Sequence, residues 1–155
     1  MTAVRSKKPA TELLVLERFL PYRLSVLSNR VSSAIAARYA DAFKLTIPEW
    51  RVIAVLGRRP GLTATEVCEA TEMDKVAVSR AVARLIKRRR ISAQADPTDG
   101  RRQKLTLTAA GAAVHAQIAP VALACERKLI AALDAREKAT LDALIDRLLD
   151  AATEL

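Results

Sequence analysis

The chain has 155 residues, of which 51% are hydrophobic and only 3% aromatic, and its formal net charge is +9. This length allows one domain with a substantial core, and many alanines and leucines with only four glycines favour helices. No apolar run is long enough to cross a membrane and there is no signal-peptide pattern, so we expect a cytoplasmic protein without a membrane partner. A single histidine, with no CxxC pair, no glycine-rich phosphate loop and no nucleophile motif, argues against an enzyme, a metal site or a cofactor.

The N-terminal part predicts a tail followed by two helical segments. Residues 1–9 are polar and basic, and we predict that they are disordered. Residues 11–20 have leucines at helical spacing, and Pro21 is expected to end or kink this arm. A second helix is predicted over residues 22–43, where apolar side chains step by three or four: Leu24, Leu27, Val31 and Ile35. Because this helix is apolar on more than one side, it needs a second body to cover it.

The next residues predict the first half of a helix-turn-helix. Pro48 suits the first turn of a helix over residues 48–56, which the glycines and arginines of residues 57–61 end. Thr63-Ala64-Thr65-Glu66 matches a capping box and begins a short helix to about residue 70. Residues 71–73 then form the turn before a recognition helix.

The recognition helix is predicted to follow Asp74, whose carboxylate suits the positive end of a helix. At about 100° per residue, one face of this helix is apolar, with Val78, Ala81, Val82 and Leu85. The opposite face is cationic, with Arg80, Arg84 and Lys87. No acidic residue follows Asp74 in the helix, so these cations lack an i,i+4 partner within it. One face is therefore suited to a core and the other to a binding partner.

A hairpin is predicted directly after this helix. Residues 91–95 form a possible strand, and Asp96-Pro97-Thr98-Asp99-Gly100 has the residue types of a turn. Residues 101–107 alternate toward their end and predict a return strand. A helix followed by a hairpin with arginines at its tip indicates a winged helix-turn-helix.

The C-terminal part predicts two further helices. Thr108 is a plausible N-cap for a long helix to about residue 133, interrupted by Pro120, and Asp134-Ala135-Arg136-Glu137 resembles another capping box. The last helix runs to about residue 152 and has one apolar stripe, formed by Leu141, Leu144, Ile145, Leu148 and Leu149. The terminal helices cannot all be covered by one small winged helix-turn-helix lobe. We therefore predict that they pair with the same helices of a second chain; the alternative is a helical cap within one chain.

Positive charge is concentrated in residues 75–104, which hold ten Lys or Arg and two acids and so account for +8 of the total +9. Charge confined to one segment indicates an anionic partner that docks at one place. A helix fits the major groove of DNA, and arginines at a hairpin tip suit the minor groove. We expect a homodimer that binds two half-sites of a palindromic operator, about 34 Å apart, in double-stranded DNA.

Individual contacts can be assigned by side-chain chemistry. Contacts to base edges are expected from Arg80 and Arg84, and contacts to thymine methyl groups from Val76 and Ala77. Phosphate contacts are expected from two hydroxyls and three cations: Thr65, Ser79, Lys75, Lys87 and Arg88. Arg101, with Arg102 beside it, is the candidate for the minor groove, and Asp99 is expected to orient the wing by pairing with an arginine. The competing interpretations are salt bridges to the protein's own acids, helix caps, packing hydroxyls and solvated surface.

Five segments share the order and spacing of a known family: Ile47-Pro48-Glu49-Trp50-Arg51, Leu62-Thr63-Ala64-Thr65-Glu66-Val67, Val78-Ser79-Arg80-Ala81-Val82-Ala83-Arg84-Leu85, Asp96-Pro97-Thr98-Asp99-Gly100-Arg101 and Leu105-Thr106-Leu107-Thr108-Ala109-Ala110-Gly111. From about residue 20 to its C-terminus, the chain resembles the MarR family of bacterial transcription regulators. The resemblance implies the wing roles given above for Asp99 and Arg101. It also implies a ligand pocket between the dimer helices and the DNA lobe, which in many members takes phenolic or aromatic carboxylates and in some their coenzyme A thioesters.

Candidate ligand residues interrupt the otherwise apolar helix of residues 22–43 or could face the same space. They are Arg23, Ser28, Asn29, Arg30, Trp50 and His115. An arginine beside an aromatic floor would suit a carboxylate or a phosphate tail. The alternative is that these arginines lie on the surface while Trp50 and His115 fill the core.

The fold class predicted is mainly α: a winged helix-turn-helix with a small β-hairpin wing and a dimerisation region formed by the N- and C-terminal helices. Residues 46–107 are expected to form the DNA-binding lobe, and residues 10–45 and 108–155 the dimerisation helices. The predicted function is a homodimeric, sequence-specific transcription regulator, a repressor released by a small aromatic acid or its coenzyme A thioester. The alternatives are a non-specific architectural DNA-binding protein and a redox-responsive regulator that uses Cys68 or Cys125.

Overall fold

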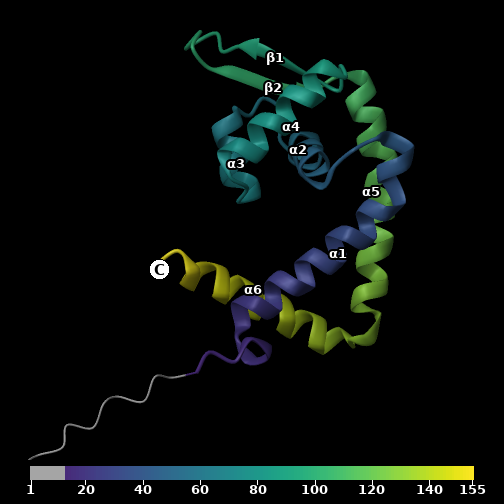
Figure 1. The fold of residues 1–155 in the computed structure, drawn as a ribbon, viewed down its shortest axis with the longest axis vertical. Coiled ribbons are helices and arrows are strands. Elements are labelled where there is room, and N and C mark those ends of the chain that lie inside the picture. Colours follow the sequence, from purple (N-terminus) through teal and green to yellow (C-terminus); the bar gives the residue numbers. More distant parts are fainter. Residues whose placement is uncertain (1–12) are drawn as a thin grey trace, which may run out of the picture.

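A computed structural model describes residues 13–155 and is mainly helical with one small hairpin (Figure 1). A short 3₁₀ turn, η1, precedes the first helix, and a second, η2, lies between the last two. The elements in order are η1 (Leu16–Arg18), α1 (Leu20–Phe43), α2 (Ile47–Arg58), α3 (Ala64–Thr71), α4 (Lys75–Lys87), β1 (Ile91–Ala95), β2 (Gln103–Leu107), α5 (Ala109–Leu129), η2 (Ile130–Ala132) and α6 (Ala135–Ala152). The predicted mainly α, winged helix-turn-helix fold is confirmed.

Local sequence signals set most helix starts. The Thr63 side chain accepts from the Glu66 amide while the Glu66 carboxylate accepts from the Thr63 amide, so the predicted capping box is formed. Asp74 caps α4 by accepting from the amide of Ala77 at 2.8 Å, and Asp134 begins α6 with a further capping box. These caps supply partners for amides that an isolated helix leaves unpaired.

Two prolines behave differently from the prediction. Pro21 does not end an N-terminal arm; it lies in the first turn of α1, where its missing amide costs no hydrogen bond. The described part of the predicted arm holds only the short turn η1, while residues 1–12, including the predicted disordered tail, lie outside the described residues. Pro120 lies inside α5 without interrupting it, and α5 ends at Leu129, where η2 begins.

The two strands pair in antiparallel register, with Ile91 opposite Leu107 and Ala95 opposite Gln103. The loop between α2 and α3 joins this hairpin, since the Gly61 amide donates to the carbonyl of Leu105 and the Leu105 amide donates to that of Leu62. The φ angle of +81° at Gly61 is one that glycine adopts without strain. The base of the wing is therefore attached to the helix-turn-helix.

Most of the buried core lies in the lobe formed by α2, α3, α4 and the hairpin. Its members include Val52, Ile53, Leu56, Val67, Val78, Leu85, Ile91 and Leu105. Only the C-terminal half of α1, through Tyr39, and the N-terminal half of α5, through Val114 and Ile118, reach this core. In Figure 1, α1 and α5 extend away from the lobe, and we call these two helices the stalk. Helix α6 follows the end of α5 that is far from the lobe.

Candidate nucleic-acid interface

Helix α4 presents one apolar and one cationic face. Val78, Ala81 and Leu85 are at most 2% exposed and pack into the core. The other face is exposed and carries Lys75, Ser79, Arg80, Arg84 and Lys87. Within residues 13–155, no acidic side chain lies within salt-bridge distance of Arg80, Arg84 or Lys87. The described structure therefore provides no internal counter-ion for this face.

Two apolar residues lie in the first turn of α4. The Val76 side chain is 58% exposed, whereas Ala77 is half-buried. An exposed valine at the start of a cationic helix costs little if a partner covers it, because burial of apolar surface is favourable. Val76 is thus available for an apolar contact, and Ala77 is less so.

The wing turn is organised by two aspartates with different partners. Asp96 is nearly buried and accepts hydrogen bonds from the amide and the hydroxyl of Thr98, at 2.9 and 2.7 Å, while Lys104 Nζ lies 3.3 Å from its other oxygen. The Thr98 hydroxyl, followed by the Thr98 amide and Lys104, holds the pKa of Asp96 at about 2, well below its usual value. Asp99 is exposed; its Oδ2 lies 3.7 Å from Arg102 Nε, and its Oδ1 accepts from the amide of Arg101 at 3.2 Å. The side chain of Asp99 thus pairs with Arg102, which leaves the Arg101 guanidinium at the tip.

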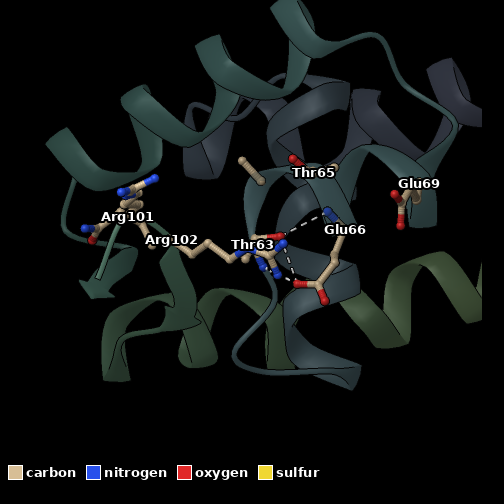
Figure 2. A pocket seen from close by; sticks show the side chains of 8 residues that line it. Thr63, Thr65, Glu66, Glu69, Arg101 and Arg102 are labelled. Atoms are coloured by element: carbon tan, nitrogen blue, oxygen red, sulfur yellow. Dashed lines mark hydrogen bonds between the residues drawn. The ribbon is translucent and has the colours of Figure 1, made fainter. Parts of the chain in front are cut away.

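A groove of about 500 Å³ lies between the start of α3 and the wing (Figure 2). Thr65 lines it from α3, and Arg101 and Arg102 line it from the hairpin. Glu66 also lines it, but its carboxylate is held by the Thr63 amide and hydroxyl at 2.7 and 2.9 Å, an arrangement that lowers the pKa of Glu66. The fold therefore brings together a predicted phosphate contact of α3 and both predicted wing arginines.

The predicted ligand residues do not converge on one groove. Arg23, Ser28, Asn29 and Arg30 are exposed on α1, where Arg23 and Arg30 line an apolar groove of about 530 Å³. Trp50 instead lies between Tyr39 and His115, with each pair of ring centroids 5.9 Å apart, and Trp50 and His115 do not line that groove. This arrangement matches the alternative in which the arginines lie on the surface and the aromatic rings pack inside.

Sequence reasoning missed Glu49 and Arg90, and it assigned Arg88 to phosphate contact. Arg88 turns toward the protein: it donates to the carbonyl of Lys44, and its Nη1 lies 3.7 Å from the buried carboxylate of Glu49. Arg90 Nη2 donates to the carbonyl of Phe43 at 2.5 Å. No local pattern predicts these contacts, because the partners precede the two arginines by 39 to 47 residues in the chain.

The described residues contain no cluster of three or more histidines, cysteines or carboxylates that could hold a metal ion. Among the same residues, no helix has the length and apolarity needed to span a bilayer. Cys68 and Cys125 are free thiols, and both are half-buried.

Comparisons with known proteins agree with this geometry. A model of the MarR family matches residues 43–102, which contain the helix-turn-helix, β1 and the wing turn and end just before β2. An HTH-type transcriptional repressor of Mycobacterium tuberculosis is 26% identical over 131 residues, which cover 84% of this chain and 91% of the relative. The structure of a MarR/EmrR family transcriptional regulator from Acinetobacter sp. ADP1 superposes with a TM-score of 0.83 at 23% identity, covering 92% of this chain and all of that one.

A second solved structure is closer in sequence. The PcaV transcriptional regulator from Streptomyces coelicolor is 31% identical, with 84% of this chain and 98% of that chain covered and a TM-score of 0.60. The family match runs through the recognition helix, and the shared fold extends to the stalk helices on both sides of it. The chain belongs to the MarR family of transcription regulators.

Proposed function

We propose that this regulator is a homodimer that binds a palindromic operator in double-stranded DNA and represses transcription until a small aromatic acid, or its coenzyme A thioester, releases it. The observation that carries the proposal is the outer face of α4, where exposed cations have no acidic partner in the described part of the chain. Exposed cations without an acidic partner are free to bind the phosphates and base edges of DNA.

Exposed apolar residues of α1 and α6 support dimerisation. The apolar stripe of α6 (Leu141, Leu144, Ile145, Leu148 and Leu149) is 40–63% exposed, and Leu20, Leu24 and Leu27 of α1 are 44–49% exposed. Patches of this kind usually mark protein interfaces. We propose that residues 10–45 and 108–155 form the dimer interface, and residues 46–107 the DNA-binding lobe.

The contacts divide by position on the lobe. Arg80 and Arg84 would read base edges in the major groove, with Val76 and Ala77 near thymine methyl groups. Lys75, Ser79, Lys87 and Thr65 would contact phosphates. Arg101, with Arg102 behind it, would enter the minor groove while Asp99 holds the turn. Arg88 is treated separately below.

The effector is proposed from the chemistry of the stalk and of two neighbours. BpsR of Bordetella bronchiseptica is described as having its DNA binding regulated by 6-hydroxynicotinic acid, and PcaV was solved with its natural ligand. Here, an apolar groove between α1 and α5 has three cations among its lining residues: Arg30, Arg38 and Lys128. An apolar groove with cations in its lining suits the ring and the carboxylate of an aromatic acid.

The test is DNA binding measured by fluorescence anisotropy at several salt concentrations, with a palindromic site from upstream of the gene and a random duplex of equal length. We expect the palindrome to bind at least about a thousandfold more tightly. Equal affinity for both would indicate an architectural DNA-binding protein and would reject the proposal.

Two variants test the division of contacts. Arg84→Ala should cost about 1–3 kcal/mol on the operator and relax base preference at one position. Lys87→Ala should weaken all duplexes alike and reduce the salt slope by about 1. A uniform loss of affinity across sequences in both variants would contradict these roles.

A further inference from the structure

Two arginines that follow α4 bind the end of α1 instead of facing outward with the rest of the cationic surface. Arg88 donates from Nη1 to the carbonyl of Lys44 and lies 3.7 Å from Glu49 Oε1. Arg90 donates from Nη2 to the carbonyl of Phe43 at 2.5 Å. Each contact links the end of the recognition helix to the last turn of a stalk helix.

The main chain of Arg89 and Arg90 holds the start of the other stalk helix, α5. The Thr108 amide donates to the carbonyl of Arg90 at 3.0 Å, and the Thr108 hydroxyl donates to the carbonyl of Arg89 at 2.7 Å. Thr108 is the N-cap of α5, and Gly111 lies so close that an added Cβ would be 1.9 Å from the Arg90 carbonyl oxygen. Both stalk helices are therefore attached to the lobe at residues 88–90, which we call the arginine joint.

The backbone of the arginine joint adopts a left-handed conformation between the two arginines that contact α1. Arg89 has φ of +54°, a left-handed conformation that is unfavourable for a non-glycine residue. This reversal follows α4 directly, and the side chains on either side of it, Arg88 and Arg90, both contact the end of α1. Lys44, which accepts from Arg88, is itself left-handed, with φ of +53°.

Electrostatics favour the same contacts. Helix α1 has no basic residue in its last turn, so the arginine joint supplies the cations that a helix C-terminus attracts. Glu49 is 1% exposed; its Oε2 accepts from the amide and hydroxyl of Thr46, at 2.7 and 2.9 Å, which leaves Oε1 facing Arg88. Removing a cation beside a buried carboxylate is costly, because the remaining charge loses its partner.

We infer that Arg88 and Arg90 are positioning residues that fix the direction of α4 relative to the stalk, and that Arg88 does not contact DNA. The inference rests on the proposed function, since in a dimer the angle between α4 and the stalk sets the separation of the two recognition helices. A ligand bound at the stalk would act on DNA through this joint. Loss of the joint would then uncouple operator spacing from dimer geometry.

The first test uses salt dependence, with the neighbouring exposed cation as the matched control. Lys87→Ala should make the negative slope of log affinity against log salt shallower by about 1, as expected for one lost phosphate contact. Arg88→Ala should leave the slope at its wild-type value although affinity for the operator falls. A slope reduced as much as in Lys87→Ala would show that Arg88 contacts phosphate and would overturn the inference.

The second test uses operators whose half-sites are separated by one base pair more or fewer. Wild type should prefer one spacing, and Arg88→Ala and Arg90→Met should lose much of that preference while retaining preference for each half-site sequence. Lys87→Ala should weaken binding to all spacings equally. Unchanged spacing preference in both joint variants would overturn the inference, whereas absence of any sequence preference in wild type would reject the proposed function instead.

Folding of each variant is checked by the emission of Trp50, the only tryptophan, which packs between Tyr39 and His115. If Arg90→Met fails to fold, Arg88→Ala carries both tests, because its side chain is 42% exposed and leaves a smaller void. Arg88→Lys is the conservative variant: a lysine can restore the charge beside Glu49 but not the forked geometry of the guanidinium. We expect it to recover part of the spacing preference.

Discussion

Replacing Gly111, in the first turn of α5, by alanine should be among the most damaging single-methyl changes in the protein. The added Cβ would lie 1.9 Å from the carbonyl oxygen of Arg90 and 2.9 Å from its carbonyl carbon, whereas ordinary contact begins near 3.4 Å. Backbone must therefore move by about 1.5 Å, either in α5 or in the arginine joint. The clash cannot be relieved by a side-chain rotation, because the Arg90 carbonyl is main chain and the position of Cβ is fixed by the main chain of residue 111.

The size of the effect follows from three contributions. Overpacking of a dense site typically costs about 1–3 kcal/mol. A shift of α5 would also weaken the two hydrogen bonds from Thr108 to the joint, each worth about 1 kcal/mol net. Against these, alanine gains at most about 1 kcal/mol over glycine in a helix. The net loss should be about 2–4 kcal/mol, or roughly 4–16 °C in Tm for a domain of this size.

The assay is urea and thermal unfolding at matched protein concentrations, because any self-association makes the apparent stability depend on concentration. Gly100→Ala is the control, since its Cβ would meet nothing within 4 Å. Gly57→Ala is an intermediate case, because its Cβ would approach the His115 ring at 2.6 Å and a side chain can yield where backbone cannot. A Gly111→Ala protein as stable as Gly100→Ala would refute the reasoning that α5 seats directly on the joint.

Three further predictions concern helix α6, the wing and the core. Leu144→Glu, on the exposed stripe of α6, should shift the protein toward monomer in sedimentation experiments and weaken operator binding, and an unchanged dimer would exclude α6 from the interface. The pKa of Asp96 is lowered from 3.8 to about 2, so its stabilising effect is complete above pH 4 and is lost as the pH falls toward 2. Asp96→Asn should therefore lower the stability at neutral pH and make the stability less dependent on pH between 4 and 2. Burial raises the pKa of Tyr39 from 10.0 to about 12, so stability should fall as pH rises above 10, and Tyr39→Phe should lack that alkaline loss in unfolding curves.

Short-range chemistry made much of the fold predictable from sequence. The caps at Thr63, Asp74, Thr108 and Asp134 lie within three residues of the amides they bind, so the pattern alone locates the helix starts. The two faces of α4 follow from helical periodicity, and the hairpin follows from the turn residues and the alternation after them. Proline was less informative: at positions 21 and 120 the same residue type was read as a break, yet one begins a helix and the other lies within one.

The exposed cationic surface of α4 was largely predictable because exposure and charge on this helix follow from its period. The roles of Arg88 and Arg90 were not, because they depend on carbonyls at the end of α1 and on a carboxylate buried in α2. The separation of Trp50 and His115 from Arg23 and Arg30 likewise depends on how α1, α2 and α5 pack. Hydrogen bonds between residues close in sequence can be predicted from the residue types and their spacing. A run of three arginines, in contrast, has the same sequence pattern whether it contacts phosphate or binds the end of a helix. Only packing between segments distant in the chain distinguishes the two, because it decides which charges lose water and must find partners inside the protein.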